Sequence, residues 1–169
     1  STSRRQRQMC IRDSSNTAIV LTEFLKEESK IRILYAEEFE NGNPQDIVDI
    51  CFNLYRKHWN TWFFVDGRNR AFVNLMKVAF NEPLSWESSK QGANPEAWKV
   101  LPVNFATEHK NMLSHLHMLV NKEYLAIPKE HDKLIISLRT AYAKEYSLDK
   151  DQSSYSDSLD LSLIHISEP

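Results

Sequence analysis

Three aspartates stand at positions where a sheet protein could gather carboxylates. Asp66 closes the apolar run "TWFFVD", which predicts a buried strand, and Gly67 follows it and lets the backbone turn away. Asp157 and Asp160 lie behind a serine-rich turn at a predicted helix start, and their spacing of three residues places both on one helical face. Because ligands of open α/β sheets bind beyond the carboxyl ends of strands, the three side chains could share one site.

The chemistry of such a site would be that of a divalent cation. Grouped carboxylates repel one another unless a cation neutralises them. Ligands that are all oxygen suit Mg²⁺ or Mn²⁺, which also accept substrate phosphate. Two such ions about 4 Å apart can activate water and stabilise the leaving oxygen in phosphodiester cleavage. The pattern alone leaves a second interpretation open, because an Asp can end a strand as a turn former and Asp-x-x-Asp can simply cap a helix.

The elements that would position these aspartates alternate along the chain. This alternation predicts an α/β fold with a mixed, partly parallel central sheet and flanking helices. We expect strands at residues 17–24, 30–39, 61–66, 98–105 and 123–128, the first two forming a hairpin. We expect helices at residues 44–59, 70–80, 107–123 and 129–146, separated by a polar loop at 81–97.

Local signals mark where two of the predicted helices begin. Asn43 is a suitable N-cap, Pro44 fits the first helical position, and Asp46 favours the first turn. Thr107 is the expected cap of the helix over 107–123. Its inward face is expected to carry four apolar residues, namely Met112, Leu113, Leu116 and Leu119.

Composition indicates one ordinary domain. The chain has 169 residues, 41% hydrophobic and 26% charged, and a net charge of -2, which does not advertise nucleic-acid binding. No apolar run reaches the roughly 20 residues of a membrane span. Cys10 and Cys51 provide neither a disulfide framework nor zinc spacing, which favours a reduced, cytoplasmic setting.

Both ends of the sequence resemble translated sequencing-library adapters. "RRQRQMCIRDS" (Arg4 to Ser14) and "LSLIHISEP" (Leu161 to Pro169) each match a reading frame of a transposase-based adapter, and the shared parts of the two DNA strings are reverse complements. We therefore expect residues 1–14 and 161–169 to be adapter-derived and residues 15–160 to be a gene fragment. On this interpretation the final helix is interrupted after Asp160, and the four arginines of the first segment are not a DNA-binding arm.

The sequence between these segments resembles the nuclease domain of viral large terminase subunits, especially forms related to archaeal and tailed-phage proteins. The stretches that carry the resemblance are "GNPQDIVD", "TWFFVDGRNRAFVNLMKV", "VLPVNFATEHKNMLSHLHMLV" and "AIPKEHDKLIISLRTAYAKEYSLDKDQSSYSDSLD". The resemblance implies an RNase H-like fold and a two-metal endonuclease that cuts concatemeric double-stranded viral DNA during genome packaging. It also implies partners, namely double-stranded DNA, an ATPase domain in the same full-length chain, the small terminase subunit and the portal, in the host cytoplasm without a membrane.

The resemblance assigns the metal ligands residue by residue. Asp66 matches the family's acid at the end of the central strand, and Asp157 and Asp160 match the acidic pair of the last helix. Asp157 is the favoured direct ligand of Mg²⁺ or Mn²⁺, with Asp160 in support. The family's first metal-binding Asp belongs on a strand that is occupied here by residues near Met9, and Asp13 is not counted as its replacement. We therefore expect this fragment to be a weak or inactive nuclease.

Two other functions stay open at the level of sequence. The chain could be another RNase H-like nuclease, of the resolvase or transposase type, or a catalytically inert RNase H-like module that binds DNA or a protein. A phosphate-binding ATPase motif upstream in the complete gene would favour the terminase. A complete gene without an acid on its first strand would favour the inert module.

Other conspicuous side chains are expected to be structural. Three histidines lack the spacing of a metal pair on a helix, namely His109, His115 and His117. Core positions are expected for the aromatic residues Trp59, Trp62 and Phe63 and for the thiol of Cys51. Contact with DNA phosphate and a plain structural or solvated role stay equally open for the arginines Arg68, Arg70 and Arg139.

Overall fold

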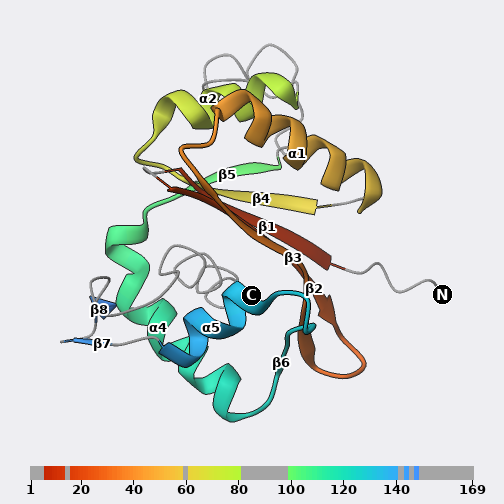
Figure 1. The fold of residues 1–169 in the computed structure, drawn as a ribbon, viewed down its shortest axis with the longest axis vertical. Helices are drawn as coiled ribbons and strands as arrows, with labels where there is room; N and C mark the ends of the chain where they lie inside the picture. Colours follow the sequence, from red (N-terminus) through yellow and green to blue (C-terminus); the bar gives the residue numbers. More distant parts are fainter. Residues whose placement is uncertain are drawn as a thin grey trace, which may run out of the picture.

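The computed structural model describes residues 6–13, 16–58, 61–80, 99–140, 143–144 and 147–148. In this part of the chain, six strands form one mixed sheet in the order β5-β4-β1-β2-β3-β6. Helices cover both of its faces, so the protein is a layered α/β/α structure (Figure 1). This is the predicted mixed sheet with flanking helices, and the expectation of an α/β fold is confirmed.

The first three strands form an antiparallel meander. β1 (Gln6–Asp13) pairs with β2 (Asn16–Leu25), and β2 pairs with β3 (Lys30–Glu40). The hairpin predicted over residues 17–39 is therefore confirmed. A register shift between Leu21 and Thr22 marks a bulge in β2.

The other half of the sheet is parallel and is built through helices. α1 (Pro44–Lys57) returns the chain to β4 (Thr61–Asp66), which lies parallel to β1. α2 (Arg70–Ala79) precedes β5 (Val100–Val103), which lies parallel to β4 at the edge of the sheet. Because β1, β4 and β5 run in the same direction, their carboxyl ends meet at one edge, and Asp66 lies there.

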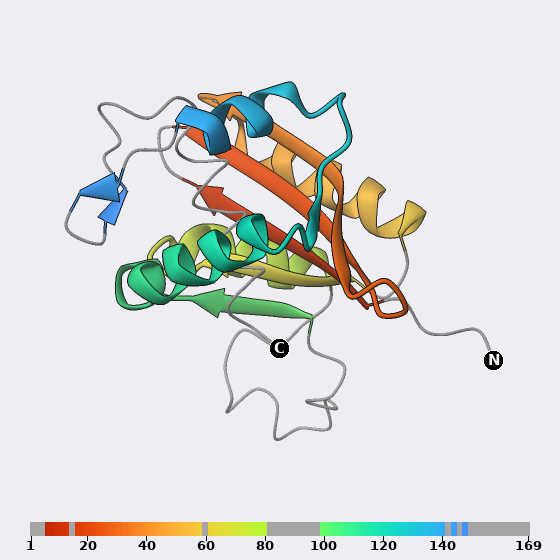
Figure 2. The ribbon, with the colours of Figure 1, turned by 90° about the horizontal axis from the view of Figure 1, so that it is seen from below.

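The remaining elements close the opposite face. α4 (Phe105–Asn121) leads to the two-residue β6 (Leu125–Ala126), which pairs parallel to β3 at the other edge of the sheet. α5 (Asp132–Thr140) follows, and then β7 (Ala143–Lys144) and β8 (Ser147–Leu148) pair with each other outside the main sheet. Seen from below, α4 and α5 lie against the side of the sheet away from α1 and α2 (Figure 2).

Two apolar clusters, one on each face, hold the layers together. Alternate residues of a strand point to opposite faces. Accordingly Met9, Ile11, Phe63 and Val65 pack with α1 and α2, while Cys10 and Phe64 pack with α4 and α5. The middle of β1 is fully buried on both sides, as a central strand requires, because Met9, Cys10 and Ile11 are each 0% exposed.

Several local predictions are confirmed. Asn43 caps α1, since its side-chain oxygen accepts a hydrogen bond from the Gln45 backbone N–H at 3.0 Å, and Pro44 and Asp46 lie in the first turn. Met112, Leu116 and Leu119 are buried on α4, and Leu113 is partly buried against the same cluster. Phe63 is fully buried and Trp62 is partly buried in the core, whereas Trp59 lies outside the described residues.

Three boundaries differ from prediction for local reasons. α4 begins two residues before the expected Thr107, because Asn104 accepts from the Ala106 N–H at 3.1 Å and caps the helix; the Thr107 hydroxyl instead donates to the Asn104 carbonyl. The helix predicted over 129–146 is wrong in extent: α5 spans only Asp132–Thr140, ending at a β-branched residue, and the β7–β8 pair follows. The predicted loop at 81–97 lies outside the described residues. Among the described helices, none is long and apolar enough to cross a bilayer.

Candidate functional site

Asp66 is a buried carboxylate at the carboxyl end of β4. The residue is only 3% exposed, and its Cα is paired with that of Val103 at the end of β5. It follows Phe64 by two positions and therefore belongs to the face of the sheet that α4 and α5 cover. A buried carboxylate is costly unless a positive group or hydrogen-bond donors compensate it, so its partners decide what it can do.

Arg68 supplies those partners in the structure. Its backbone N–H donates to Asp66 Oδ1 at 3.1 Å, and its Nε–H donates to the same oxygen at 3.3 Å. The Arg68 Nη2 group lies 3.0 Å from Asp66 Oδ2, so the guanidinium contacts both carboxylate oxygens. The Arg68 side chain is 59% exposed, so it reaches the buried carboxylate from the solvent side.

The turn after β4 explains this return. Gly67 donates its N–H to the Val103 carbonyl at 2.9 Å, and a Cβ at Gly67 would lie 3.3 Å from that same oxygen, so the close approach to β5 favours glycine. The Asn69 N–H donates to the Asp66 carbonyl at 3.3 Å, and Asn69 caps α2 through the Phe72 N–H. Asp66 thus also forms the turn, which is the second interpretation that the sequence left open.

β1 lies directly beside this carboxylate. Cys10 is paired with Phe64, and Ile11 with Val65, so residue 12 is the position of β1 level with Asp66. Gln8 and Cys10 belong to the face of the sheet that Asp66 shares, and neither is acidic. Met9, which marks the place assigned to the first acid, lies in the middle of β1 but faces α1 and α2. Asp13 is the last residue of β1, paired with Thr17.

The other two predicted ligands cannot be placed beside Asp66. Asp157 and Asp160 lie outside the described residues, so their convergence with Asp66 stays a prediction. Within the described part of the chain, no three His, Cys, Asp or Glu side chains lie close enough together to hold a metal ion. This agrees with the rejection of a histidine site, and His117 instead contacts the Asn121 side-chain amide one turn further along α4.

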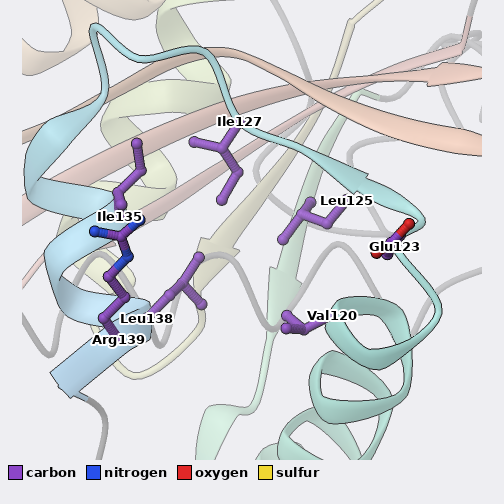
Figure 3. A pocket seen from close by; sticks show the side chains of 7 residues that line it. All are labelled: Val120, Glu123, Leu125, Ile127, Ile135, Leu138 and Arg139. Carbon is purple, nitrogen blue, oxygen red and sulfur yellow. The ribbon is translucent and has the colours of Figure 1, made fainter.

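A pocket of about 300 Å³ lies elsewhere, between the end of α4, β6 and α5. Its wall is mostly apolar, with Leu125 and Ile127 facing Ile135 and Leu138, and Glu123 and Arg139 stand at opposite sides (Figure 3). Arg139 therefore lines this pocket, and Asp66 is not among the lining residues. The pocket does not belong to the carboxylate site.

A second buried carboxylate lies toward the amino end of β1, which sequence reasoning missed. Glu23 is 1% exposed, and its Oε1 lies 3.0 Å from Arg7 Nη2 while its Oε2 lies 2.6 Å from Arg32 Nη2. The pattern held one signal for it, since Glu23 falls inside the apolar run of β2 at a position facing α1. His58, at the end of α1, has a pKa below its ordinary value because burial disfavours its charged form and Arg7 and Lys57 repel it.

These features define the class of fold. A three-stranded antiparallel meander, extended beyond its first strand by two parallel strands and covered by helices on both faces, is the RNase H-like arrangement implied by the resemblance. In this arrangement the carboxyl ends of β1 and β4 lie side by side, with Asp66 at that edge.

Solved structures of large terminase nucleases share this fold. The chain superposes on the large terminase nuclease of thermophilic phage G20c with a TM-score of 0.62 at 15% identity, covering 96% of this chain and 81% of that one. The magnesium-bound form of that nuclease gives a TM-score of 0.65 at 13% identity, covering 98% and 82%. The large terminase of a second thermophilic bacteriophage gives a TM-score of 0.68 at 8% identity, covering 95% of this chain but only 38% of its own. No protein-family model and no curated protein matches the sequence. The chain therefore has the RNase H-like fold of large terminase nucleases, and at these identities the likeness concerns the fold.

Proposed function

We propose that this chain is the nuclease domain of a large terminase subunit, which cuts concatemeric double-stranded viral DNA during genome packaging. The observation that carries the proposal is a buried carboxylate, Asp66, at the carboxyl end of β4 in a fold shared with the G20c nuclease. That edge is where open α/β sheets bind their ligands. The pocket beside α5 offers no comparable acid cluster, since Glu123 is its single carboxylate.

The donor at this edge fits a divalent cation. Asp66 offers oxygen atoms only, and its burial demands a positive partner, which are the conditions that Mg²⁺ or Mn²⁺ sites meet. We propose that Asp66 and Asp157 hold the metal, with Asp160 in support. Cations held there would activate water and stabilise the leaving oxygen of the phosphodiester. The structure of the G20c nuclease with bound magnesium supports this choice of ion.

The assembly proposed for the chain follows from the same relatives. The match to the second phage's large terminase, solved in complex with ATP-gamma-S, spans 39% of that longer protein. We propose that the parent protein likewise joins this domain to an ATPase, and that it acts with the small terminase subunit and the portal in the host cytoplasm. The motor and its partners would then supply grip on double-stranded DNA, for which the net charge of -2 provides little.

One observation favours an inert module for the fragment itself. The β1 side chains described on the face of Asp66 are those of Gln8 and Cys10, and neither can supply a carboxylate. With the first acid missing, a metal site loses both charge and geometry. We therefore propose that the parent nuclease is active and that this fragment cleaves DNA weakly or not at all.

Restoring an acid on β1 tests the proposal. Gln8→Asp and Cys10→Asp each place a carboxylate on the face of Asp66, and position 10 lies nearer the carboxyl edge than position 8. We expect one of them to cleave linear double-stranded DNA with Mn²⁺ at least about 100-fold faster than the unmodified chain. Adding Asp66→Asn should remove that gain. Fast cleavage by the unmodified chain would contradict the proposed defect, and folded but inactive restored variants would favour the inert module.

A further inference from the structure

The pair formed by Asp66 and Arg68 points to a role for Arg68 that the fold alone does not assign. The guanidinium engages both oxygens of a carboxylate that is only 4% exposed, yet most of the arginine side chain lies in solvent. A guanidinium in this position neutralises Asp66 in the way that a bound cation would.

We infer that Arg68 is an exchangeable counter-ion of Asp66: it keeps the carboxylate ionised and oriented in the metal-free domain, and its guanidinium leaves when a divalent cation binds. This inference rests on the proposed function and deepens it. It makes Arg68 a positioning residue for the metal-free state, and it makes the exchange a competition for the same two oxygens.

The geometry separates the part of Arg68 that must stay from the part that can leave. The backbone N–H of Arg68 donates to Asp66 Oδ1 as part of the turn, and it does not depend on the guanidinium. The Gly67 N–H bond to Val103 and the Asn69 cap hold the same turn independently. Release of the guanidinium therefore breaks the contacts at 3.3 and 3.0 Å and leaves the backbone of the site in place.

The exposure of Arg68 keeps the exchange easy. A side chain that is 59% exposed can return its guanidinium to water by rotation about its own bonds, without opening the core. A fully buried partner would instead lose its solvation shell in both states. After release, Arg68 would stay at the carboxyl edge of β4, where a positive charge can contact the phosphate of bound DNA.

A matched pair of variants tests the competition. Arg68→Ala removes the counter-ion, whereas Arg70→Ala removes the same charge two residues further along, at an exposed position in the first turn of α2. By titration calorimetry with Mg²⁺, we expect Arg68→Ala to bind the ion at least about fivefold more tightly than the unmodified chain. Arg70→Ala should change the affinity less than about twofold, which is the size expected of a screened surface charge.

Nuclear magnetic resonance of the unmodified chain provides a readout that needs no variant and no DNA cleavage. We expect Mg²⁺ to shift the Gly67 amide signal and, in the same titration, to shift the Arg68 Nε–Hε signal toward the position of a solvent-exposed arginine. A shifted Gly67 amide with an unmoved Arg68 signal, and no gain in affinity for Arg68→Ala, would overturn the exchange and leave the metal site standing. The absence of Mg²⁺ binding in both the unmodified chain and Arg68→Ala would overturn the exchange together with the proposed function.

Discussion

Cys10 is paired with Phe64 across the parallel β1–β4 ladder, two residues before the strand ends at Asp66. The thiol therefore occupies the face of the central strand from which a carboxylate could reach toward Asp66. In this chain that position is apolar and fully buried. The relationship explains why the carboxyl edge can have the right fold for a nuclease while one part of its donor set is missing.

The ion-paired Glu23 predicts a strong and specific effect on stability. Replacing Glu23 with Gln removes the negative partner of Arg7 and Arg32 within a mostly buried group, and we expect the free energy of unfolding to fall by about 2 kcal/mol or more. Urea denaturation followed by circular dichroism measures the change. Glu27→Gln, at an exposed position after the same strand, should cost less than about 0.5 kcal/mol. Equal losses in the two variants would show that the Glu23 pairs contribute nothing.

His58 predicts a pH dependence of stability. Its pKa is lowered in the folded state because burial, Arg7 and Lys57 disfavour the charged form, so the unfolded chain binds this proton more readily. The contribution to stability is therefore complete above the ordinary value near 6.5 and is lost as the pH falls below it. We expect His58→Gln to reduce the fall in melting temperature between about pH 7 and pH 5. An unchanged fall in the variant would remove His58 as its cause.

The two cysteines predict the chemistry of a packed core. Cys10 and Cys51 are both 0% exposed, and burial raises the pKa of the Cys51 thiol, so little thiolate is available for reaction. At pH 8 we expect a thiol reagent such as Ellman's reagent to label both residues more than about 100-fold more slowly in the native protein than in denaturant. Fast native labelling of Cys10 alone would show that β1 opens independently of the sheet, and fast labelling of both would contradict the core.

Much of this fold could be predicted from local pattern, and the exceptions have physical causes. Alternating and β-branched residues marked β2 and β3, and the apolar run marked β4, because burial on a sheet leaves a period in the sequence. β1 carries only three consecutive buried apolar residues between polar ones, and its identity as the central strand depends on pairing with two partners far along the chain. Local pattern holds no record of such pairing. The place of β1 was expected only from the resemblance.

The candidate site divides in the same way. The position of Asp66 at the end of a buried strand could be predicted, because the strand and the following Gly67 are local signals. The bond from Arg68 back to Asp66 could not, because it depends on the turn that Gly67 and Val103 fix between two strands. The buried Glu23 was missed because its two arginines come from neighbouring strands. The expectation that residues 1–14 and 161–169 are adapter-derived stays a prediction.

The central claim is that Asp66 shares one divalent cation with the acidic pair of the last helix. Crystals of the acid-restored chain soaked in Mn²⁺ and measured at the manganese absorption edge test it most directly, because anomalous scattering locates the ion without assumption. The account predicts an anomalous peak bound by Asp66 and by Asp157 or Asp160, with metal–oxygen distances of about 2.0–2.3 Å. A peak held without Asp66, or carboxyl groups of Asp66 and the pair more than about 10 Å apart, would contradict it, since ligands of one ion lie within about 5 Å of one another.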